Sequence, residues 1–241
     1  MFKKERDFMK SAWTTEPMRD TDQLRKLPMP PFEDKYDEKS LIVLPDPKSA
    51  ELKKRDVVQV MEERASRRKF GNDPVTLHDL SFILWASAGL KEIKNGRIFR
   101  IVPSAGSRHP FESFFYADRV TGLQSGLYRY VAVRNAVVPV SFQNGLKDEL
   151  DRCLMKQWFN AAFAIFWVAN SYRSEWRYAH LSHKMSLIDA GHICQNAYLA
   201  AESLGLGCCA IGAYLQEIDA ALGVDGENEF CVYAGVFGPA G

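Results

Sequence analysis

The sequence predicts an α+β fold, in which helices and strands interleave without the regular strand–helix–strand alternation of a parallel sheet. The 241 residues are 46% hydrophobic, which is enough to bury a sizeable core and excludes a disordered chain or a disulfide-held miniprotein. A wholly apolar run at 161–169, typical of a strand buried on both faces, precedes a long helical pattern at 174–204. These observations together predict one well-packed domain with mixed secondary structure.

The first fifty residues differ from the rest of the chain. They hold six of the eleven prolines, no glycine, and ten basic against ten acidic residues. The proline-rich segment at 28–36 cannot run as an interior helix or a central strand. We therefore expect residues 1–50 to form an extended N-terminal arm that lies across a partner subunit, with a disordered tail as the alternative. Residues 51–241 are expected to form the domain.

The domain is predicted to begin with two helices. Apolar residues between Ala50 and Ala65 recur at near-helical spacing, and a basic run follows them. The second helix is expected from Thr76 to Gly89, because Thr76 and Asp79 match a capping box and Gly89 is a stop signal. Strands are then predicted at 112–117, 127–133 and 136–140, and an amphipathic helix at 144–155.

The C-terminal half is expected to hold the most buried elements. After the strand at 161–169, the residues from 174 to 204 are predicted to form one helix, whose second half is apolar nearly all round. That pattern predicts a buried central helix rather than a surface helix. Short strands at 208–212 and 230–237 follow, with a capped helix at 216–222 between them.

Composition excludes several classes of function. The net charge is only +1, so neither a nucleic acid nor a membrane surface is the expected partner. The longest apolar run, nine residues, is about half of a membrane span, and the N-terminus lacks the apolar region of a secretory signal. The five cysteines are odd in number and have no zinc-ribbon spacing, which favours free thiols in a cytoplasmic protein.

Three familiar motifs are set aside. Residues 205–210 match G-x-G-x-x-A but close a helix and open a strand, the reverse of a dinucleotide-binding turn, so the glycines are interpreted as helix terminators. His180, His183 and His192 have no cysteine or carboxylate at a ligand spacing, so no metal site is predicted. No G-x-S-x-G segment occurs, so a serine-histidine-acid triad is not predicted.

Two polar segments favour a phosphorylated cofactor. Arg64, Arg67, Arg68 and Lys69 are the strongest local charge feature; they could complement a helix C-terminus or hold a phosphate dianion through guanidinium forks. The sequence Pro-Ser-Ala-Gly-Ser-Arg-His-Pro at 103–110 predicts a rigid loop whose hydroxyls and backbone amides stay available to a ligand, although an ordinary loop remains the alternative.

These two segments recur in a recognisable order with two others. The four are R-A-S-R-R-K-F at 64–70, P-S-A-G-S-R-H-P-F-E-S at 103–113, D-A-G-H-I-C-Q-N-A-Y at 189–198 with its continuation to 207, and C-A-I-G-A-Y at 209–214. Together they resemble the nitroreductase superfamily of flavin enzymes, and within it the SagB-type branch of thiazoline/oxazoline dehydrogenase-like proteins. The resemblance spans residues 60–238.

The resemblance implies a nitroreductase-like fold, with a mixed, mostly antiparallel sheet flanked by helices and a long buried central helix. It also implies a homodimer that binds FMN at the interface, each site being built from both subunits. A family site of this kind leaves most of the chemistry to the cofactor, while the protein supplies binding and orientation.

Nine residues are assigned to the FMN site by this resemblance. They are Arg64, Ser66, Arg68, Ser104, Ala105, Ser107, Arg108, Ile211 and Gly212. Arg64, Ser66 and Arg68 would hold the phosphate, the ribityl chain and the N1/O2 edge, where a cation stabilises reduced flavin. The backbone at 211–212 would face N5, since glycine permits close approach. Gln195 and Asn196 are expected to satisfy buried backbone groups instead.

The chain departs from the branch pattern at two places. Azoline dehydrogenases of the branch carry a Lys-Tyr pair ahead of the central helix, and Arg177 and Tyr178 stand at that position. Arginine stays protonated and is a poor general base, which leaves Tyr178 as the candidate proton relay. The C-terminal residues 238–241 contain no basic side chain for the FMN phosphate, so that Arg108 or Arg67 takes that role or flavin binding is weaker.

The predicted function is an FMN-dependent oxidoreductase. Hydride would pass through flavin N5 in a ping-pong sequence, from NAD(P)H to a nitroaromatic, a quinone or a similar small-molecule acceptor. A peptide azoline dehydrogenase and a catalytically degenerate flavin-binding protein are the alternatives.

Overall fold

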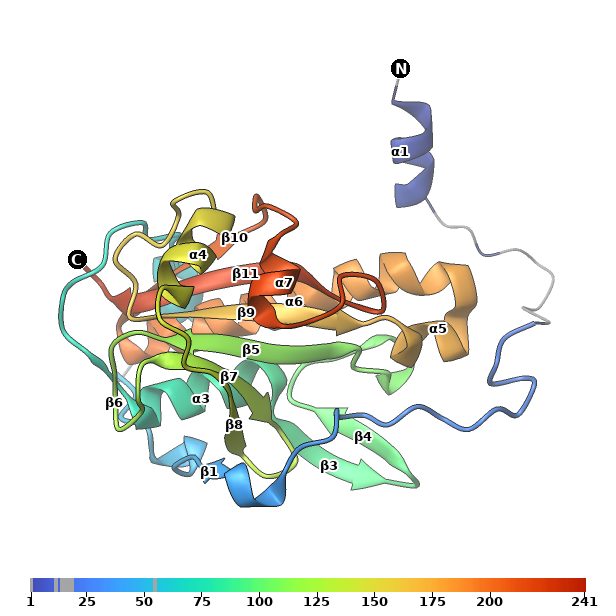
Figure 1. Ribbon diagram of the computed structural model, residues 1–241, viewed down its shortest axis with the longest axis horizontal. Helices are drawn as coiled ribbons and strands as arrows, with labels where there is room; N and C mark the ends of the chain where they lie inside the picture. The colour runs from blue at the N-terminus through green and yellow to red at the C-terminus, as the bar shows by residue number, and fades with distance from the viewer. Residues whose placement is uncertain (1, 11–12, 14–19, 54–55) are drawn as a thin grey trace.

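A seven-stranded sheet forms the centre of the molecule in the computed structural model, which describes residues 2–10, 13, 20–53 and 56–241 (Figure 1). The strand order is β1-β8-β7-β5-β9-β11-β10, and every neighbouring pair is antiparallel. The bounds are β1 Ile42–Val43, β5 Phe111–Ala117, β7 Gly126–Val131, β8 Ala136–Ser141, β9 Phe163–Asn170, β10 Leu206–Ile211 and β11 Glu229–Pro239. Each strand predicted from the sequence falls on one of these, and the predicted α+β class is confirmed.

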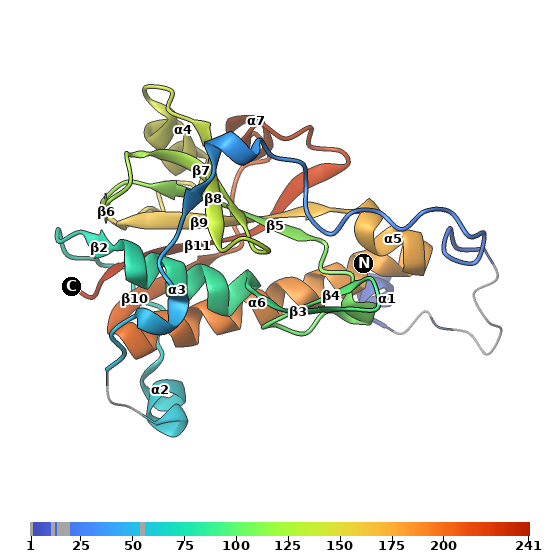
Figure 2. The ribbon, with the colours of Figure 1, turned by 90° about the horizontal axis from the view of Figure 1, so that it is seen from below.

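Helices cover both faces of this sheet (Figure 2). The pair α3 (Leu77–Ala88) and α6 (Ser182–Leu204) covers one face, while α4 (Leu146–Cys153) and α7 (Ile218–Leu222) cover the other. Strand β9 alternates between the two apolar cores, since Trp167 lies in the first and Phe166 in the second. The prediction of a strand buried on both faces is therefore confirmed.

The single helix predicted over 174–204 is wrong at its N-terminal end. Helix α5 (Tyr172–Tyr178) stops where Ala179 adopts φ 45° and ψ −132°, and a short 3-10 turn (Ala179–Leu181) leads into α6. The helical hydrogen-bond ladder cannot continue through that backbone conformation. The break turns α5 away from the axis of α6 and sets Arg177 and Tyr178 at the junction. The prediction of a helix buried nearly all round is borne out on one face of α6 only, since Leu187 and Ile188 are about half exposed in the single chain.

The helix predicted over 50–65 is shorter than expected. Helix α2 (Val57–Glu63) starts at a capping box in which the Asp56 carboxylate accepts from the Gln59 N–H. Residues 54–55 lie outside the described residues, and 51–53 are not helical. The predicted cap of α3 is confirmed, because the Thr76 hydroxyl accepts from the Asp79 N–H at 3.1 Å.

Two short sheets and several short helices were not predicted. The sheets pair β2 (Val75–Thr76) with β6 (Val120–Thr121) and β3 (Leu90–Lys94) with β4 (Arg97–Arg100). The helices are α1 (Lys3–Met9) and the 3-10 turns Glu38–Ser40, Pro47–Ser49 and Ala105–Ser107. The arm is thus helical at 3–9 rather than extended throughout.

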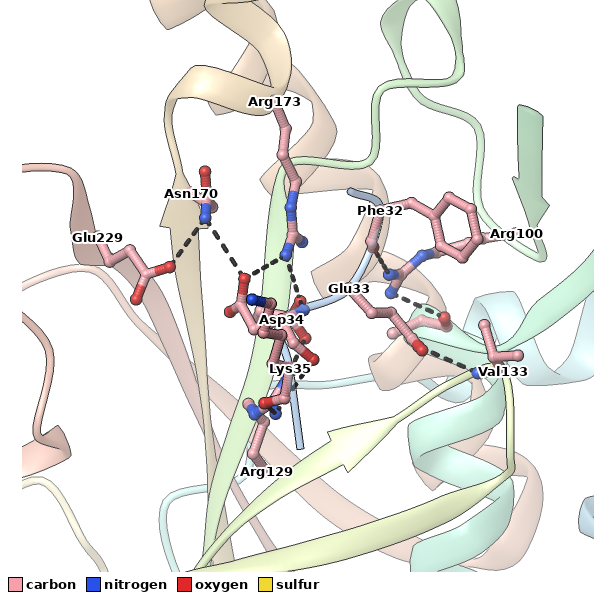
Figure 3. Close-up of polar contacts among 12 residues, drawn as sticks. Phe32, Glu33, Asp34, Lys35, Arg100, Arg129, Val133, Asn170, Arg173 and Glu229 are labelled. Atoms are coloured by element: carbon pink, nitrogen blue, oxygen red, sulfur yellow. Dashed lines mark hydrogen bonds and ion pairs between the residues drawn. The ribbon is translucent and has the colours of Figure 1, made fainter. Parts of the chain in front are cut away.

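The later part of the arm lies on its own chain. The Asp34 carboxylate is 2.6 Å from Arg173 Nη2, Arg129 Nη2 donates to the carbonyl of Lys35, and the Glu33 carboxylate accepts from the Val133 N–H (Figure 3). Strand β1 then adds an edge to the sheet beside β8. Among the described residues, no helix is both long and apolar enough to cross a membrane.

Candidate active site

The first predicted site segment, residues 64–70, lies along the edge of the sheet. It follows α2 directly, and Arg67 N–H donates to the carbonyl of Cys208 in β10 at 2.9 Å. Ser66 pairs with Cys208 in a parallel bridge. The backbone of this segment is therefore held in register beside β10, and Ser66 and Arg68 are exposed.

Tyr198 of α6 is the anchor of this segment. Its hydroxyl accepts from the Ala210 N–H at 2.7 Å and lies 2.8 Å from the Ser66 hydroxyl. The Arg64 guanidinium lies over the Tyr198 ring, 5.2 Å from its centroid. Burial raises the pKa of Tyr198, so that the phenol stays protonated and can donate to Ser66. Arg64 and Ser66 are thereby brought together at one place.

The arginines of this segment differ in their partners. Arg67 is 3.0 Å from the buried carboxylate of Glu202, so it is engaged in the fold and is a poor candidate for a phosphate ligand. Arg64 and Arg68 have no carboxylate partner within the described part of the chain. Burial raises the pKa of Cys209 against the effect of the nearby Arg68, so the thiol adds no negative charge here.

The loop at 103–110 is fastened to α6 through Asp189. The Ser104 hydroxyl donates to the Asp189 carboxylate at 2.6 Å, and the Ala105 N–H donates to its other oxygen at 3.2 Å. His109 N–H in turn donates to the Ser104 oxygen at 2.8 Å. Burial raises the pKa of Asp189, and these hydrogen bonds act in the opposite direction. The loop is thus a fixed structure rather than a flexible connection.

The predicted catalytic pair lies against the same loop. Gly106 has φ 57°, and a Cβ at this position would collide with the Tyr178 hydroxyl and with Nε of Arg177. The Arg177 guanidinium lies 5.5 Å from the centroid of the Tyr178 ring. The Trp13 ring meets the Tyr178 ring edge to face at 6.1 Å. Glycine at 106 is required because only it admits both side chains at this backbone conformation.

Arg108 points into the body of the protein behind this pair. Its Nε donates to the carbonyl of Arg173 at 2.6 Å, and its guanidinium lies 4.9 Å from the centroid of the Trp176 ring. Ser107, the residue before it, has φ 54° and is partly exposed. At the end of β10, Ile211 is buried and Gly212 is exposed.

The single chain therefore holds two groups of candidate residues on different stretches of α6. Arg64 and Ser66 contact Tyr198, whereas Ser104 and Ala105 contact Asp189. The two anchors are nine positions apart along the helix, or about 13 Å at the rise of an α-helix. Gln195 is exposed, so the prediction for it is wrong, while Asn196 donates to the carbonyl of Ala86 as expected.

The two anchor residues, Asp189 and Tyr198, were not predicted from the sequence. Asp189 and Tyr198 are among the buried polar residues of α6, with Ser182 and Glu202, and Trp176 on α5 supports Arg108. A carboxyl group inside an apolar helix is a signal that could have found Asp189, because a buried acid needs partners.

A sequence model of the nitroreductase family matches residues 61–239. The chain belongs to the nitroreductase family. A "putative nitroreductase" of Methanocaldococcus jannaschii is 35% identical to it over 175 residues, which are 72% of this chain and 84% of the archaeal protein.

Solved structures share the nitroreductase fold. A Ralstonia eutropha protein of the same description superposes with a TM-score of 0.69 at 24% identity, over 84% of this chain and 90% of the other. The Escherichia coli microcin synthetase McbBCD, with truncated pro-MccB17 bound, matches with a TM-score of 0.65 at 20% identity, over 97% and 85%. A Desulfovibrio desulfuricans member in complex with FMN matches with a TM-score of 0.53 at 18% identity, over 78% and 89%.

Proposed function

We propose that this nitroreductase-family protein is an FMN-dependent oxidoreductase that passes hydride from NAD(P)H to a small-molecule acceptor such as a nitroaromatic or a quinone. The observation that carries the proposal is the pair Arg64 and Arg68, two cations with no carboxylate partner among the described residues, in a segment of the matched family region. Cations without a counter-charge suit an anionic cofactor.

The donor set fits FMN. Arg64, Ser66 and Arg68 would hold its phosphate, ribityl chain and N1/O2 edge. The fixed loop would line the ring system with Ser104, Ala105 and Ser107, and the backbone at Ile211 and Gly212 would lie near N5. Arg108 was assigned to the same site, but its side chain points into the protein, so it would act from behind the loop. Gly106 supports this assignment, since it lets the loop approach Tyr178 closely.

A homodimer is part of this proposal. The two groups of candidate residues are about 13 Å apart along α6, which supports a site completed by the opposite group of a second subunit. The half-exposed Leu187 and Ile188 lie directly before Asp189 on α6 and are candidates for burial in that interface. We keep the division into an arm, residues 1–50, and a domain, residues 51–241. The five cysteines are all free and buried, which supports a reducing, cytoplasmic setting.

The chain's own residues would bind, orient and supply protons. FMN supplies hydride transfer when bound. Arg64 and Arg68 neutralise negative charge on the cofactor side. Tyr178 presents a hydroxyl at the loop and can donate a proton to the reduced acceptor, while Arg177 stays charged beside it and cannot act as a base.

A second candidate is an azoline dehydrogenase acting on peptide thiazoline or oxazoline rings. It is favoured by the likeness to the McbBCD complex, which covers nearly the whole chain. Here Tyr178 would take the ring proton as hydride leaves. The arginine at 177, in place of the branch's lysine, counts against it because arginine is a poor base.

The experiment is anaerobic reduction followed by the flavin spectrum. The purified protein should be yellow or become yellow with added FMN. NADPH or NADH should then rapidly bleach the absorbance of the bound flavin. Colourless protein that cannot be reconstituted would overturn both enzyme candidates. Flavin that neither nicotinamide bleaches would instead favour the azoline dehydrogenase or a degenerate flavin-binding protein.

A further inference from the structure

We propose that the arm segment 22–34 positions Tyr178 for proton transfer, because this segment holds helix α5, whose last two residues are Arg177 and Tyr178. The inference rests on the proposed function, in which Tyr178 gives a proton to the acceptor. It goes further by assigning Asp34, on the N-terminal arm, as a positioning residue for that step.

The proline-rich part of the arm offers its carbonyl groups to side chains of the domain. Proline has no N–H, so a segment with prolines at 28, 30 and 31 cannot join a sheet ladder. Side-chain donors bind the carbonyls on either side of it. The Trp176 indole donates to the carbonyl of Leu27 at 3.1 Å, and Arg100 Nη2 donates to the carbonyl of Phe32 at 3.2 Å. One of these donors, Trp176, belongs to α5.

The first turn of α5 is held by two carboxylates of the arm. The Tyr172 hydroxyl donates to the Asp22 carboxylate at 2.9 Å. Arg173 Nη2 donates to the Asp34 carboxylate at 2.6 Å (Figure 3). Arg173 is only 1% exposed, and Glu112 of the central sheet lies 2.6 Å from the same nitrogen. The start of α5 is therefore fixed between the arm and the sheet.

The last turn of α5 is held by both the arm and the domain. The carbonyl of Trp176 accepts from the Gln23 N–H at 2.9 Å, in addition to the bond from its indole to the arm. The Arg108 guanidinium lies over the Trp176 ring, 4.9 Å from its centroid. A helix of seven residues is too short to be stable without tertiary contacts. These contacts therefore decide where the two residues after Trp176 project.

Tyr178 has little freedom to move without losing its place at the loop. A Cβ on Gly106 would collide with the Tyr178 hydroxyl, so the phenol lies directly against the backbone of the loop. The arm also reaches Tyr178 itself, since the Trp13 ring meets the Tyr178 ring edge to face at 6.1 Å. A displacement of α5 would separate the hydroxyl from the loop.

The proton step depends on this placement. A quinone that accepts a hydride on one oxygen needs one further proton on the other oxygen to become the hydroquinone. The O–H bond of Tyr178 would break to supply that proton, and water would reprotonate the phenolate. Such a transfer requires hydrogen-bond distance between the two oxygens. A shift of the phenol by about 1 Å is therefore enough to slow it.

The experiment measures two rates in FMN-loaded protein by stopped flow: reduction of the flavin by NADH or NADPH, and its reoxidation by 1,4-benzoquinone. The arm variant is Asp34→Asn, and Tyr172→Phe removes the other contact at the first turn. Glu38→Gln is the control, because Glu38 is an arm residue that pairs with Arg134 and not with α5. Tyr178→Phe, alone and combined with each of the first two changes, completes double-mutant cycles. Hydrogen exchange of the amides of α5 and α4 is followed in the same preparations and needs no flavin.

We expect Tyr178→Phe to slow reoxidation by roughly a hundredfold. Asp34→Asn should slow it by about tenfold, with flavin content and the rate of reduction by the nicotinamide unchanged. Tyr172→Phe should have a smaller effect and Glu38→Gln none. Asp34→Asn should cause no further loss when the Tyr178 hydroxyl is already absent, because it acts through that group. The α5 amides should exchange about tenfold faster in Asp34→Asn, while the α4 amides keep their wild-type rate.

Equal slowing by Asp34→Asn with and without the Tyr178 hydroxyl would overturn the inference, as would α5 amides that exchange at the wild-type rate. If Asp34→Asn does not fold, the same two comparisons are made with Tyr172→Phe. Reoxidation of Tyr178→Phe at the wild-type rate would overturn the role of Tyr178, and this inference with it. Protein that binds no flavin would instead overturn the proposed function, and the exchange of α5 would still show whether the arm holds the helix.

Discussion

Arg129 and Arg173 lie in the core beside carboxylates, whereas Arg64, Arg68 and Arg177 at the candidate site face no carboxylate among the described residues. Glu112 of β5 is within 2.6 Å of Arg173 and 3.5 Å of Arg129. We call Arg129, Arg173, Asp34 and Glu112 the core ion cluster, and Arg64, Arg68 and Arg177 the site arginines.

The difference shows what each set of charges does. In the core ion cluster, each arginine has a carboxylate from a different part of the chain, so the cluster ties the arm and α5 to the sheet (Figure 3). The site arginines stabilise nothing comparable within the chain. The matched charges of the core stabilise the fold, whereas the site arginines remain available to an anionic ligand.

The largest effect should come from the core ion cluster. Glu112→Gln removes the carboxylate shared by Arg129 and Arg173 and leaves both cations less compensated in the core. Breaking a buried pair from one side costs about 3–5 kcal/mol. Urea unfolding should show a loss of this order, with flavin still bound by the folded fraction. Glu149→Gln is the control, because its exposed pair with Arg152 is worth at most about 1 kcal/mol. Equal losses of unfolding free energy in Glu112→Gln and Glu149→Gln would contradict the special role of the core ion cluster.

The site arginines should give the opposite result. Arg64→Gln combined with Arg68→Gln should weaken FMN binding by roughly a hundredfold or more, since two charge-assisted contacts are lost. The free energy of unfolding should change by less than about 1 kcal/mol, because Arg68 is exposed and Arg64 is only partly buried. Flavin titration and urea unfolding of the same preparation provide the two measurements.

Arg67→Gln is a matched control from the same segment. Arg67 has a carboxylate partner, the buried Glu202, so its loss should lower the free energy of unfolding by about 1–3 kcal/mol. Flavin affinity should fall much less than in the double variant. If Arg67→Gln released flavin while the double variant kept it, the assignment of the cofactor to Arg64 and Arg68 would be wrong.

Much of the fold could be predicted because its elements have strong local signals. The uniformly apolar run around Trp167 predicted β9, and Thr76 with Asp79 predicted the start of α3. The sequence also contains a signal for the β3–β4 hairpin, which was not predicted. Asn95 and Gly96 form the type of dipeptide that favours tight hairpin turns, and both have positive φ in the structure. Its charged, exposed strands lack the alternation on which the other strand predictions relied.

The break at Ala179 and the anchors of the site could not be predicted in the same way. Nothing in the helical pattern of 174–204 marks Ala179, because tertiary contacts rather than propensity impose its positive φ. Asp189 and Tyr198 became visible only when the loop and the 64–70 segment were placed beside α6. The structure brings the site residues assigned by the family resemblance together in two groups. The residues that anchor these groups, Asp189 and Tyr198, were not predicted.

The smallest expected effect is on the pH dependence of stability, and it distinguishes carboxylates near the core ion cluster from an exposed one. Burial raises the pKa of Glu229, and Asp34 raises it further, although Asn170 donates to it at 2.8 Å. Asp225 is the counterpart, since backbone N–H groups of residues 227, 228 and 229 donate to its carboxylate and hold its pKa below the ordinary 3.8.

The two groups should act with opposite sign. Because the pKa of Glu229 is raised in the folded state, the folded protein binds more protons than the unfolded chain at pH values between 4.5 and the folded-state pKa. The free energy of unfolding therefore falls as the pH rises through this interval. The contribution of Asp225 is present above 3.8 and is lost as pH falls through its lower folded value. Urea midpoints measured from about pH 3 to pH 7 should therefore decline less with rising pH in Glu229→Gln than in wild type. Asp225→Asn should instead reduce the loss on the acid side. If the urea midpoint of Glu229→Gln changed with pH in parallel with wild type, the neighbouring arginines would neutralise this carboxylate fully. The contrast between matched and unmatched charges would then not apply to Glu229, which lies next to the core ion cluster.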